Sequence, residues 1–306
     1  MKKLISMIVL CLLTACTFGV RAEVKVAEVF SSHMVLQREK AVKVWGTADA
    51  DGRWMVELNP MKATAKPQTM TISGKKNRVV LKNLLVGEVW LASGQSNMEY
   101  SMNAHPKYAK PQKGDSDYLK HEWEKAKNPH IRLLYIEKNL NCDTLPTHGW
   151  QMVTQESLTP FSAAAWFFAE MLQDSLQVPV GIITSAWGGT YIEDWMDGDT
   201  DIYTQKQQHL VNQWRKAFRD DSLPFYYVQI SPFIYSTRRE LVAKTWLDLP
   251  RFWDAQTRCM DVISNSGMVV TTDIPENLND IHPPYKWVVG FRLARWALHD
   301  VYDYHR

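Results

Sequence analysis

Five short apolar runs beyond residue 85 constrain the fold of this chain most strongly. Each has the length of a strand, is rich in aliphatic or aromatic residues, and is separated from the next by polar or helical segments. Strands that are apolar on both faces are typical of parallel sheets covered by helices. The runs therefore predict an α/β domain with a layered parallel sheet. They are VGEVWLAS (86–93), IRLLYIE (131–137), VPVGIITSAWGG (178–189), PFYYVQI (224–230) and GMVVTTD (267–273).

The segment from Glu23 to about Leu84 has a different pattern. Short alternating or β-branched runs are broken there by Gly, Asp, Lys and Asn, with no helical period. We expect a small antiparallel, β-sandwich-like domain over residues 23–84 and the α/β domain over residues 85–306. Within the latter, residues 161–176 predict a helix capped by Ser162, whose Trp and Phe side chains are most simply core residues.

The first 22 residues resemble a secretory signal. Two lysines precede an apolar stretch over residues 4–13, which is shorter than a membrane span, and small residues lead to Ala22. We therefore expect no transmembrane span and export to the periplasm or the medium after cleavage at Ala22. Residues 13–16, Leu-Thr-Ala-Cys, also fit a lipoprotein signal in which Cys16 is lipidated.

Charge and metal-ligating residues exclude two classes of function. Removal of residues 1–22 takes away three basic residues and no acid, which turns the formal net charge of +2 into −1 and disfavours a nucleic-acid partner. The nine histidines form no metal-binding cluster, so we predict no metal site. Cys142 and Cys259, outside the leader, could pair in an oxidising compartment, although sequence does not decide it. Nothing in the sequence indicates an oligomeric state.

Ser96 is the first candidate for a chemical role. It follows the run at 86–93, at the end of a strand where open α/β sheets bind ligands, and a sharp turn through Ser93 and Gly94 would expose its hydroxyl. In isolation, a serine in such a turn more often caps a short helix. Met98 excludes the G-x-S-x-G nucleophile elbow. Both interpretations, nucleophile and cap, stay open on this stretch alone.

His282 supplies a partner for this serine. It precedes two prolines, which favours extended backbone, and a helix is predicted from about Tyr285. Residues two apart in an extended segment point to the same side, so Asp280 can reach the imidazole and fix its tautomer. Alternatively, Asp280 caps the helix and His282 lies on the surface. A nucleophilic serine needs a base that is neutral near pH 7, which favours the pairing with Ser96.

A buried strand is predicted to end at Gly188 and Gly189. Glycines let backbone N–H groups approach a reacting centre, so this pair could form an oxyanion hole together with the N–H of Ser96. A tight turn between strand and helix is the other interpretation.

Seven stretches, in this order, resemble the SGNH hydrolase superfamily and specifically its sialate O-acetylesterase-like carbohydrate esterases. The resemblance implies a flavodoxin-like, three-layer fold and cofactor-free removal of acetyl groups from the hydroxyls of sialic acids or other acetylated glycans. The matching stretches are VFSSHMVLQ (29–37), VKVWG (42–46), GEVWLASGQSNMEYSM (87–102), PVGIITSAWGGTYIEDW (179–195), LPFYYVQISPF (223–233) and a terminal block of GMVVTTDI (267–274) with DIHPPYK (280–286).

The resemblance also implies a role for each site residue. Ser96 would be the nucleophile, His282 the general base and acid, and Asp280 its orienting carboxylate. Backbone N–H groups of Ser96 and of Gly188 or Gly189 would bind the oxyanion, and Gln95 and Asn97 would contact the substrate.

Two departures from the family pattern matter. The acid usually lies three residues before the histidine, where this chain has Asn279, so either Asp280 or Asp273 must orient His282. A Gln-Gly-Glu-Ser-Asn block, whose Asn binds the oxyanion, is also missing, which predicts an internal deletion near residues 197–203. The alternatives to an esterase acting on glycans are therefore a catalytically impaired carbohydrate-binding remnant and, among enzymes, a lipase or thioesterase of the superfamily.

Overall fold

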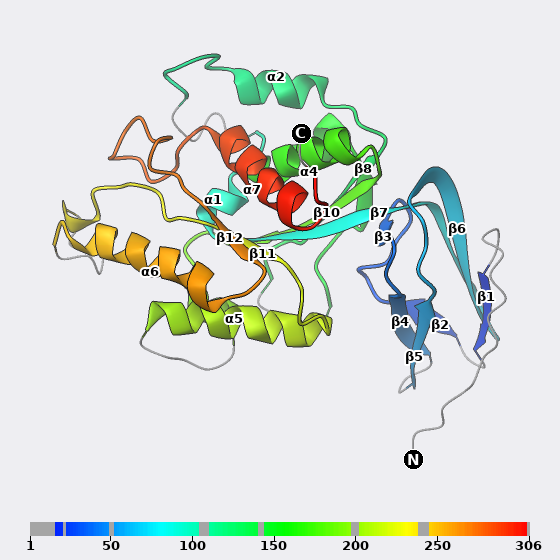
Figure 1. The fold of residues 1–306 in the computed structure, drawn as a ribbon. Coiled ribbons are helices and arrows are strands. Elements are labelled where there is room, and N and C mark those ends of the chain that lie inside the picture. The colour runs from blue at the N-terminus through cyan, green and yellow to red at the C-terminus, as the bar shows by residue number, and fades with distance from the viewer. Residues whose placement is uncertain are drawn as a thin grey trace. The chain divides into compact units, whose positions relative to one another are not determined.

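The computed structural model describes residues 16–20, 23–48, 52–103, 110–139, 144–196, 202–237 and 245–304. Apart from the backbone of residues 16–20, the expected leader lies outside the described residues, as do Cys142 and residues 197–201 of the expected deletion. The chain forms two compact units (Figure 1). Unit 1 comprises Met1–Trp90, Asn128–Met152 and Val178–Ile183, and unit 2 comprises Leu91–Lys127, Val153–Gln177 and Thr184–Arg306.

Unit 1 contains an antiparallel sheet in the region where one was predicted. Its strands are β2 (Val24–Val26), β4 (Val42–Ala48) and β5 (Gly52–Leu58), and both neighbouring pairs run antiparallel. Alternate residues of β4 are buried, as the sequence pattern indicates, and Val44 is 2% exposed.

The larger sheet also begins in unit 1. Its strand order is β1-β6-β7-β10-β8-β9, with β3 pairing parallel to β7. The last residues of β7 and β10 extend into unit 2. The strands are β1 (Cys16–Val20), β3 (Val35–Gln37), β6 (Thr64–Gly74), β7 (Arg78–Gly94), β8 (Ile131–Tyr135), β9 (Trp150–Met152) and β10 (Val180–Ala186).

Unit 2 combines helices with a small parallel sheet of β11 (Phe225–Val228) and β12 (Ser266–Val269). The long helices α4 (Ala163–Leu176) and α7 (Lys286–Asp300) pack against each other, as do α5 (Tyr203–Phe218) and α6 (Asp248–Val262) (Figure 1). The shorter helices are α1 (Ser96–Glu99), α2 (Tyr118–Lys125), α3 (Gln155–Leu158), η1 (Ile192–Trp195) and η2 (Tyr235–Thr237).

The α4–α7 contact forms part of the core of unit 2. Ser162 caps α4 by accepting the N–H of Ala165 at 3.2 Å, as predicted. Trp166 and Phe167 are at most 1% exposed, so these aromatic residues are core residues, also as predicted. Gly290 lets α7 approach closely, because a Cβ there would lie 2.5 Å from the carbonyl oxygen of Ala164.

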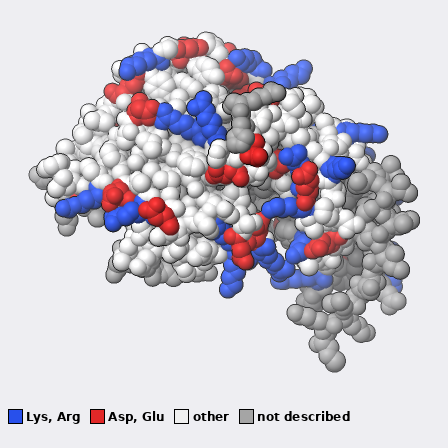
Figure 2. All heavy atoms as spheres, in the orientation of Figure 1, with Lys and Arg blue, Asp and Glu red and all other residues white. Residues whose placement is uncertain are grey.

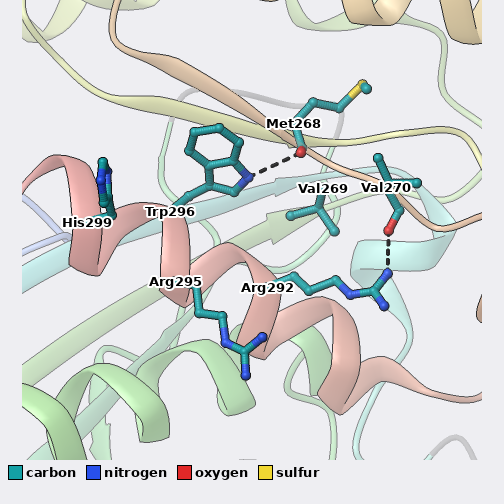
Figure 3. Close-up of a pocket in the computed structure, with 7 residues that line it drawn as sticks. All are labelled: Met268, Val269, Val270, Arg292, Arg295, Trp296 and His299. Atoms are coloured by element: carbon teal, nitrogen blue, oxygen red, sulfur yellow. Dashed lines mark hydrogen bonds between the residues drawn. The ribbon is translucent and has the colours of Figure 1, made fainter. Parts of the chain in front are cut away.

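Helix α7 also covers one edge of β12. The indole N–H of Trp296 donates to the carbonyl of Met268 at 3.1 Å, and Arg292 donates to the carbonyl of Val270 at 2.6 Å (Figure 3). The same residues line a cavity of about 490 Å³ between strand and helix (Figure 3). Side chains of α7 thus donate to backbone carbonyls that would otherwise accept hydrogen bonds from a neighbouring strand.

The predicted α/β class is confirmed, and each of the five apolar runs overlaps a strand. The structure differs from a single continuous sheet, because β11 and β12 pair with each other apart from the sheet that contains β10. Between β10 and β11, the described residues hold η1 and α5 and no strand. The internal deletion itself stays a prediction.

Two observations concern possible binding partners and membranes. On the face drawn in Figure 2, lysines and arginines lie interspersed with aspartates and glutamates. Within the described part of the chain, no helix combines the length and apolar character needed to cross a membrane.

Candidate active site

Ser96 lies in a tight turn between β7 and α1. The strand ends at Gly94, whose φ of +147° is a conformation that favours glycine, and the carbonyl of Gly94 accepts the N–H of Trp187 at 2.8 Å. Gln95 is the N-cap residue of α1 and Ser96 is the first helical residue. The hydroxyl of Ser96 therefore does not cap this helix and faces another partner.

That partner is His282. Its Nε2 lies 3.0 Å from Oγ of Ser96, within hydrogen-bond distance. For Nε2 to accept the hydroxyl proton, Nδ1 must carry the ring proton. The His282 side chain is 20% exposed, so a substrate can reach the pair from solvent.

Asp280 lies beside the other ring nitrogen of His282. Its Oδ1 accepts the backbone N–H of His282 at 2.8 Å and lies 3.6 Å from Nδ1. The second distance is longer than a direct hydrogen bond, but catalytic hydrogen bonds are often long in unliganded sites and tighten with substrate. The carboxylate is anchored by the backbone where it can favour a proton on Nδ1.

Asp273, the other candidate for orienting His282, has a different partner. Arg292 of α7 donates to both carboxylate oxygens, one of them at 2.8 Å, and this hydrogen bonding lowers the pKa of Asp273. Asn279 is exposed and its amide lies 3.4 Å from the side-chain oxygen of Asn277. Of these residues, Asp280 is the one with contacts to His282.

The two glycines after β10 differ in their surroundings. The N–H of Gly188 donates to Oε2 of Glu99 at 2.6 Å, and a Cβ at Gly188 would lie 3.1 Å from Cβ of Ser96. Gly189 has a φ of +88°, and a Cβ there would meet no atom within 4 Å. Space for a side chain is therefore tight at Gly188, whereas Gly189 favours glycine for its backbone conformation.

Gln95 and Asn97, expected at the substrate, hold other parts of the site. Nε2 of Gln95 donates to the carbonyl of Thr190 at 2.8 Å, which links the turn at Ser96 to the turn that follows Gly188 and Gly189. Nδ2 of Asn97 donates to the carbonyl of Ile281 at 3.1 Å, which links the same turn to the loop that contains His282, called the histidine loop below. Gln95 is exposed and keeps a surface for a ligand, whereas both ends of the Asn97 amide have protein partners.

Sequence reasoning missed Lys286, the residue that binds the other end of the Asn97 amide. Its Nζ donates to Oδ1 of Asn97 at 2.6 Å and to the carbonyl of Pro283 at 2.8 Å. Burial lowers the pKa of Lys286 to about 7, although the charge of Asp280 opposes this shift. A lysine at the start of the apolar stretch that opens this helix, four residues after His282, was the available signal.

Among the residues that the structure describes, no three His, Cys, Asp or Glu side chains gather in a way that could hold a metal ion. Cys259 is buried with a free thiol, and burial raises its pKa to about 11.

Comparison with known proteins points to one family. Residues 86–205, which include Ser96, Gly188 and Gly189, match the sequence model of carbohydrate esterases described as sialic acid-specific acetylesterases. This segment is therefore similar to the sialic acid-specific acetylesterase family. The resemblance read from the sequence motifs is thereby confirmed.

Matches to individual proteins point to the same acetylesterase family. The chain is 32% identical over 161 residues to the sialate O-acetylesterase of Mus musculus and 31% identical over 153 residues to that of Homo sapiens. These matches cover 50% and 47% of this chain but only 29% and 28% of the two relatives. The chain thus matches less than a third of their length.

A solved structure extends the likeness to most of the chain. A carbohydrate acetylesterase from Xanthomonas citri superposes with a TM-score of 0.78 at 25% sequence identity, covering 92% of this chain and 76% of that one. The predicted SGNH-type α/β fold with a small antiparallel sheet is therefore confirmed.

Proposed function

We propose that this protein is an exported serine esterase that removes O-acetyl groups from sialic acids or other acetylated glycans. The observation that carries the proposal is the 3.0 Å contact between Oγ of Ser96 and Nε2 of His282, with Asp280 beside the other ring nitrogen. A serine, a base and an orienting carboxylate in this arrangement form the nucleophilic machinery of acyl transfer.

The proposed reaction proceeds through an acyl-enzyme. Oγ of Ser96 attacks the acetyl carbonyl carbon while Nε2 of His282 takes the hydroxyl proton. The tetrahedral intermediate collapses, its bond to the sugar oxygen breaks, and His282 returns the proton to that oxygen. Water then attacks the acetyl-serine with His282 again as base, and acetate and free Ser96 are released.

Oxyanion stabilisation is the weakest part of this site. The sequence lacks the Asn block of its relatives, and the N–H of Gly188 donates to Glu99. The N–H groups of Ser96 and Gly189 are the donors we assign. Since removal of one oxyanion donor typically costs about 10²–10³-fold in turnover, we expect a slow esterase.

Export is the second part of the proposal. The basic, apolar and small-residue regions of residues 1–22 support cleavage after Ala22 and release to the periplasm or medium. Lipidation of Cys16 is the other processing route, and the mass of the mature N-terminus separates the two.

The deciding experiment measures acetate release by the mature chain from an aryl acetate and from an O-acetylated sialic acid. Ser96→Ala and His282→Ala should each reduce turnover to background, with Ser93→Ala as a matched control on the same turn. Activity should fall steeply from acetyl to longer acyl esters, whereas a lipase would prefer longer chains. A folded wild-type protein that binds glycans and releases no acetate would instead be the impaired remnant.

A further inference from the structure

Lys286 occupies a position that is unfavourable for a lysine. It is 2% exposed and lies in the first turn of α7, where the helix dipole disfavours a cation. Among the described residues, no carboxylate lies within ion-pair distance of its Nζ. Burying an amine under these conditions costs free energy, so packing alone does not explain its presence.

The contacts of Lys286 join the two segments that carry the proposed catalytic residues. Its Nζ binds Asn97 Oδ1 and the Pro283 carbonyl, and lies 4.6 Å from the ring centre of Tyr100. Asn97 follows Ser96 directly, and Pro283 follows His282 directly. One amine therefore bridges the residue after the nucleophile and the residue after the base.

Asn97 completes the bridge from the other side. Its Nδ2 donates to the carbonyl of Ile281, the residue before His282. The backbone on both sides of the histidine is thus held by the Asn97–Lys286 pair. Because a displacement of about 1 Å in a catalytic group can cost about 10²-fold in rate, this pair is in a position to control turnover.

We propose that Lys286 is a positioning residue: by holding Asn97, it keeps the neighbouring Ser96 in the correct position relative to His282. This inference rests on the proposed esterase function and adds a residue to it. Lys286 touches no reacting atom and acts through its two hydrogen bonds. The ammonium carries three N–H groups and the neutral amine two, so the bridge persists in either protonation state.

The first test replaces Lys286 by Met, an unbranched apolar side chain one atom shorter, which removes both hydrogen bonds. We expect kcat for an aryl acetate to fall about 10- to 100-fold with KM unchanged, because substrate contacts stay intact. Lys286→Gln, whose amide retains two N–H groups, should recover part of the loss. Arg295→Met, which removes an exposed cation from the same helix, should retain wild-type kcat. Wild-type kcat in Lys286→Met would overturn the proposal.

A double-mutant cycle tests whether Lys286 acts through Asn97. Asn97→Leu should lower kcat to a similar extent as Lys286→Met, and the double variant should be no slower than either single variant. Effects that multiply would show that Lys286 acts independently and would contradict the bridge. If Lys286→Met does not fold, the cycle is run with Lys286→Leu, which also removes both hydrogen bonds.

Hydrogen exchange tests the role of Lys286 independently of the proposed esterase activity. Backbone amides of residues 280–285 and 95–99 should exchange faster in Lys286→Met than in wild type, whether or not the wild-type protein turns over acetyl esters. An inactive wild type with this change would refute the esterase and keep the bridge. Unchanged exchange in both segments would refute the bridge.

Discussion

Polar side chains on α1 and its N-cap join the turn at Ser96 to two other parts of the chain. Gln95 binds the carbonyl of Thr190, Glu99 binds the N–H of Gly188, and Asn97 binds the histidine loop. Ser96 lies between these three contacts and directs its hydroxyl to His282. The motif around Ser96 is therefore used largely to assemble the site, and only a small part of it is free to contact a ligand.

The two glycines should respond differently to substitution. Gly188→Ala places a Cβ 2.9 Å from Glu99 Oε2 and 3.1 Å from Cβ of Ser96, so we expect displacement of the nucleophile and a loss of about 100-fold or more in kcat/KM. Gly189→Ala has space but forces alanine to a φ of +88°, which should cost about 1–2 kcal/mol of stability.

Esterase assays and urea unfolding of both variants measure these effects. A Gly188→Ala protein with wild-type kcat/KM would contradict the assigned geometry.

We expect Tyr191 to contact the sugar of the proposed substrate. It is 74% exposed and follows Thr190, whose carbonyl is bound by Gln95. Aromatic rings combine apolar area with a polar edge, and we expect Tyr191→Ala to raise KM for a glycan acetate about 3- to 10-fold. Hydrolysis of a small aryl acetate and the stability of the protein should not change. Tyr191→Phe distinguishes the ring from its hydroxyl, and an equal KM increase for both substrates would count against sugar binding.

The residues proposed for chemistry could be predicted from sequence because each stands in a short local pattern. A strand end before Ser96 and two prolines after His282 constrain the backbone locally. Lys286 and Glu99 could not be placed this way. Their contacts with Asn97 and Gly188 span 189 and 89 residues of chain, and they depend on how the turns and loops pack.

At the scale of elements, we expect the position of His282 to depend on the packing of α7 against α4, because α7 begins four residues after His282. We expect Gly290→Ala to destabilise the fold by about 1–3 kcal/mol, because its Cβ would lie 2.5 Å from Ala164 O and 2.8 Å from Phe167 Cβ. The displaced helix should also lower kcat, since α7 begins directly after the histidine loop. Urea denaturation and kinetics test both effects, with Arg295→Ala on the exposed face of α7 as control. Unchanged stability would mean that the helices tolerate a wider separation.

Strand existence could be predicted from sequence, but strand pairing could not. An apolar run such as residues 267–273 indicates burial on both faces without specifying the neighbour. In the structure β12 pairs with β11 on one side, and side chains of α7 bind its carbonyls on the other (Figure 3). Gly267 permits this arrangement, because a Cβ there would lie 2.5 Å from the ring of Trp296.

For the whole molecule, ionisation of buried groups makes stability depend on pH. Burial raises the pKa of Glu170 to about 8, with contributions from Glu122 and Asp174. The native state therefore retains a proton on Glu170 that the unfolded chain has lost, and this group lowers the free energy of unfolding as pH rises from about 4.5 to 8. Lys286 has the opposite effect on the free energy of unfolding, in a higher range of pH.

The pKa of Lys286 is about 7 in the folded protein against 10.5 for the ordinary side chain, with Asp280 the charged group that opposes the shift. Between these values the unfolded chain binds more protons than the native state, so the free energy of unfolding should rise with pH by at most about 1.4 kcal/mol per unit. Lys286→Met removes this group and keeps Glu170. Urea unfolding from pH 6 to 10 should therefore give a wild-type curve that rises relative to the variant above pH 7. Parallel curves would mean that Lys286 is charged in the folded protein throughout this range.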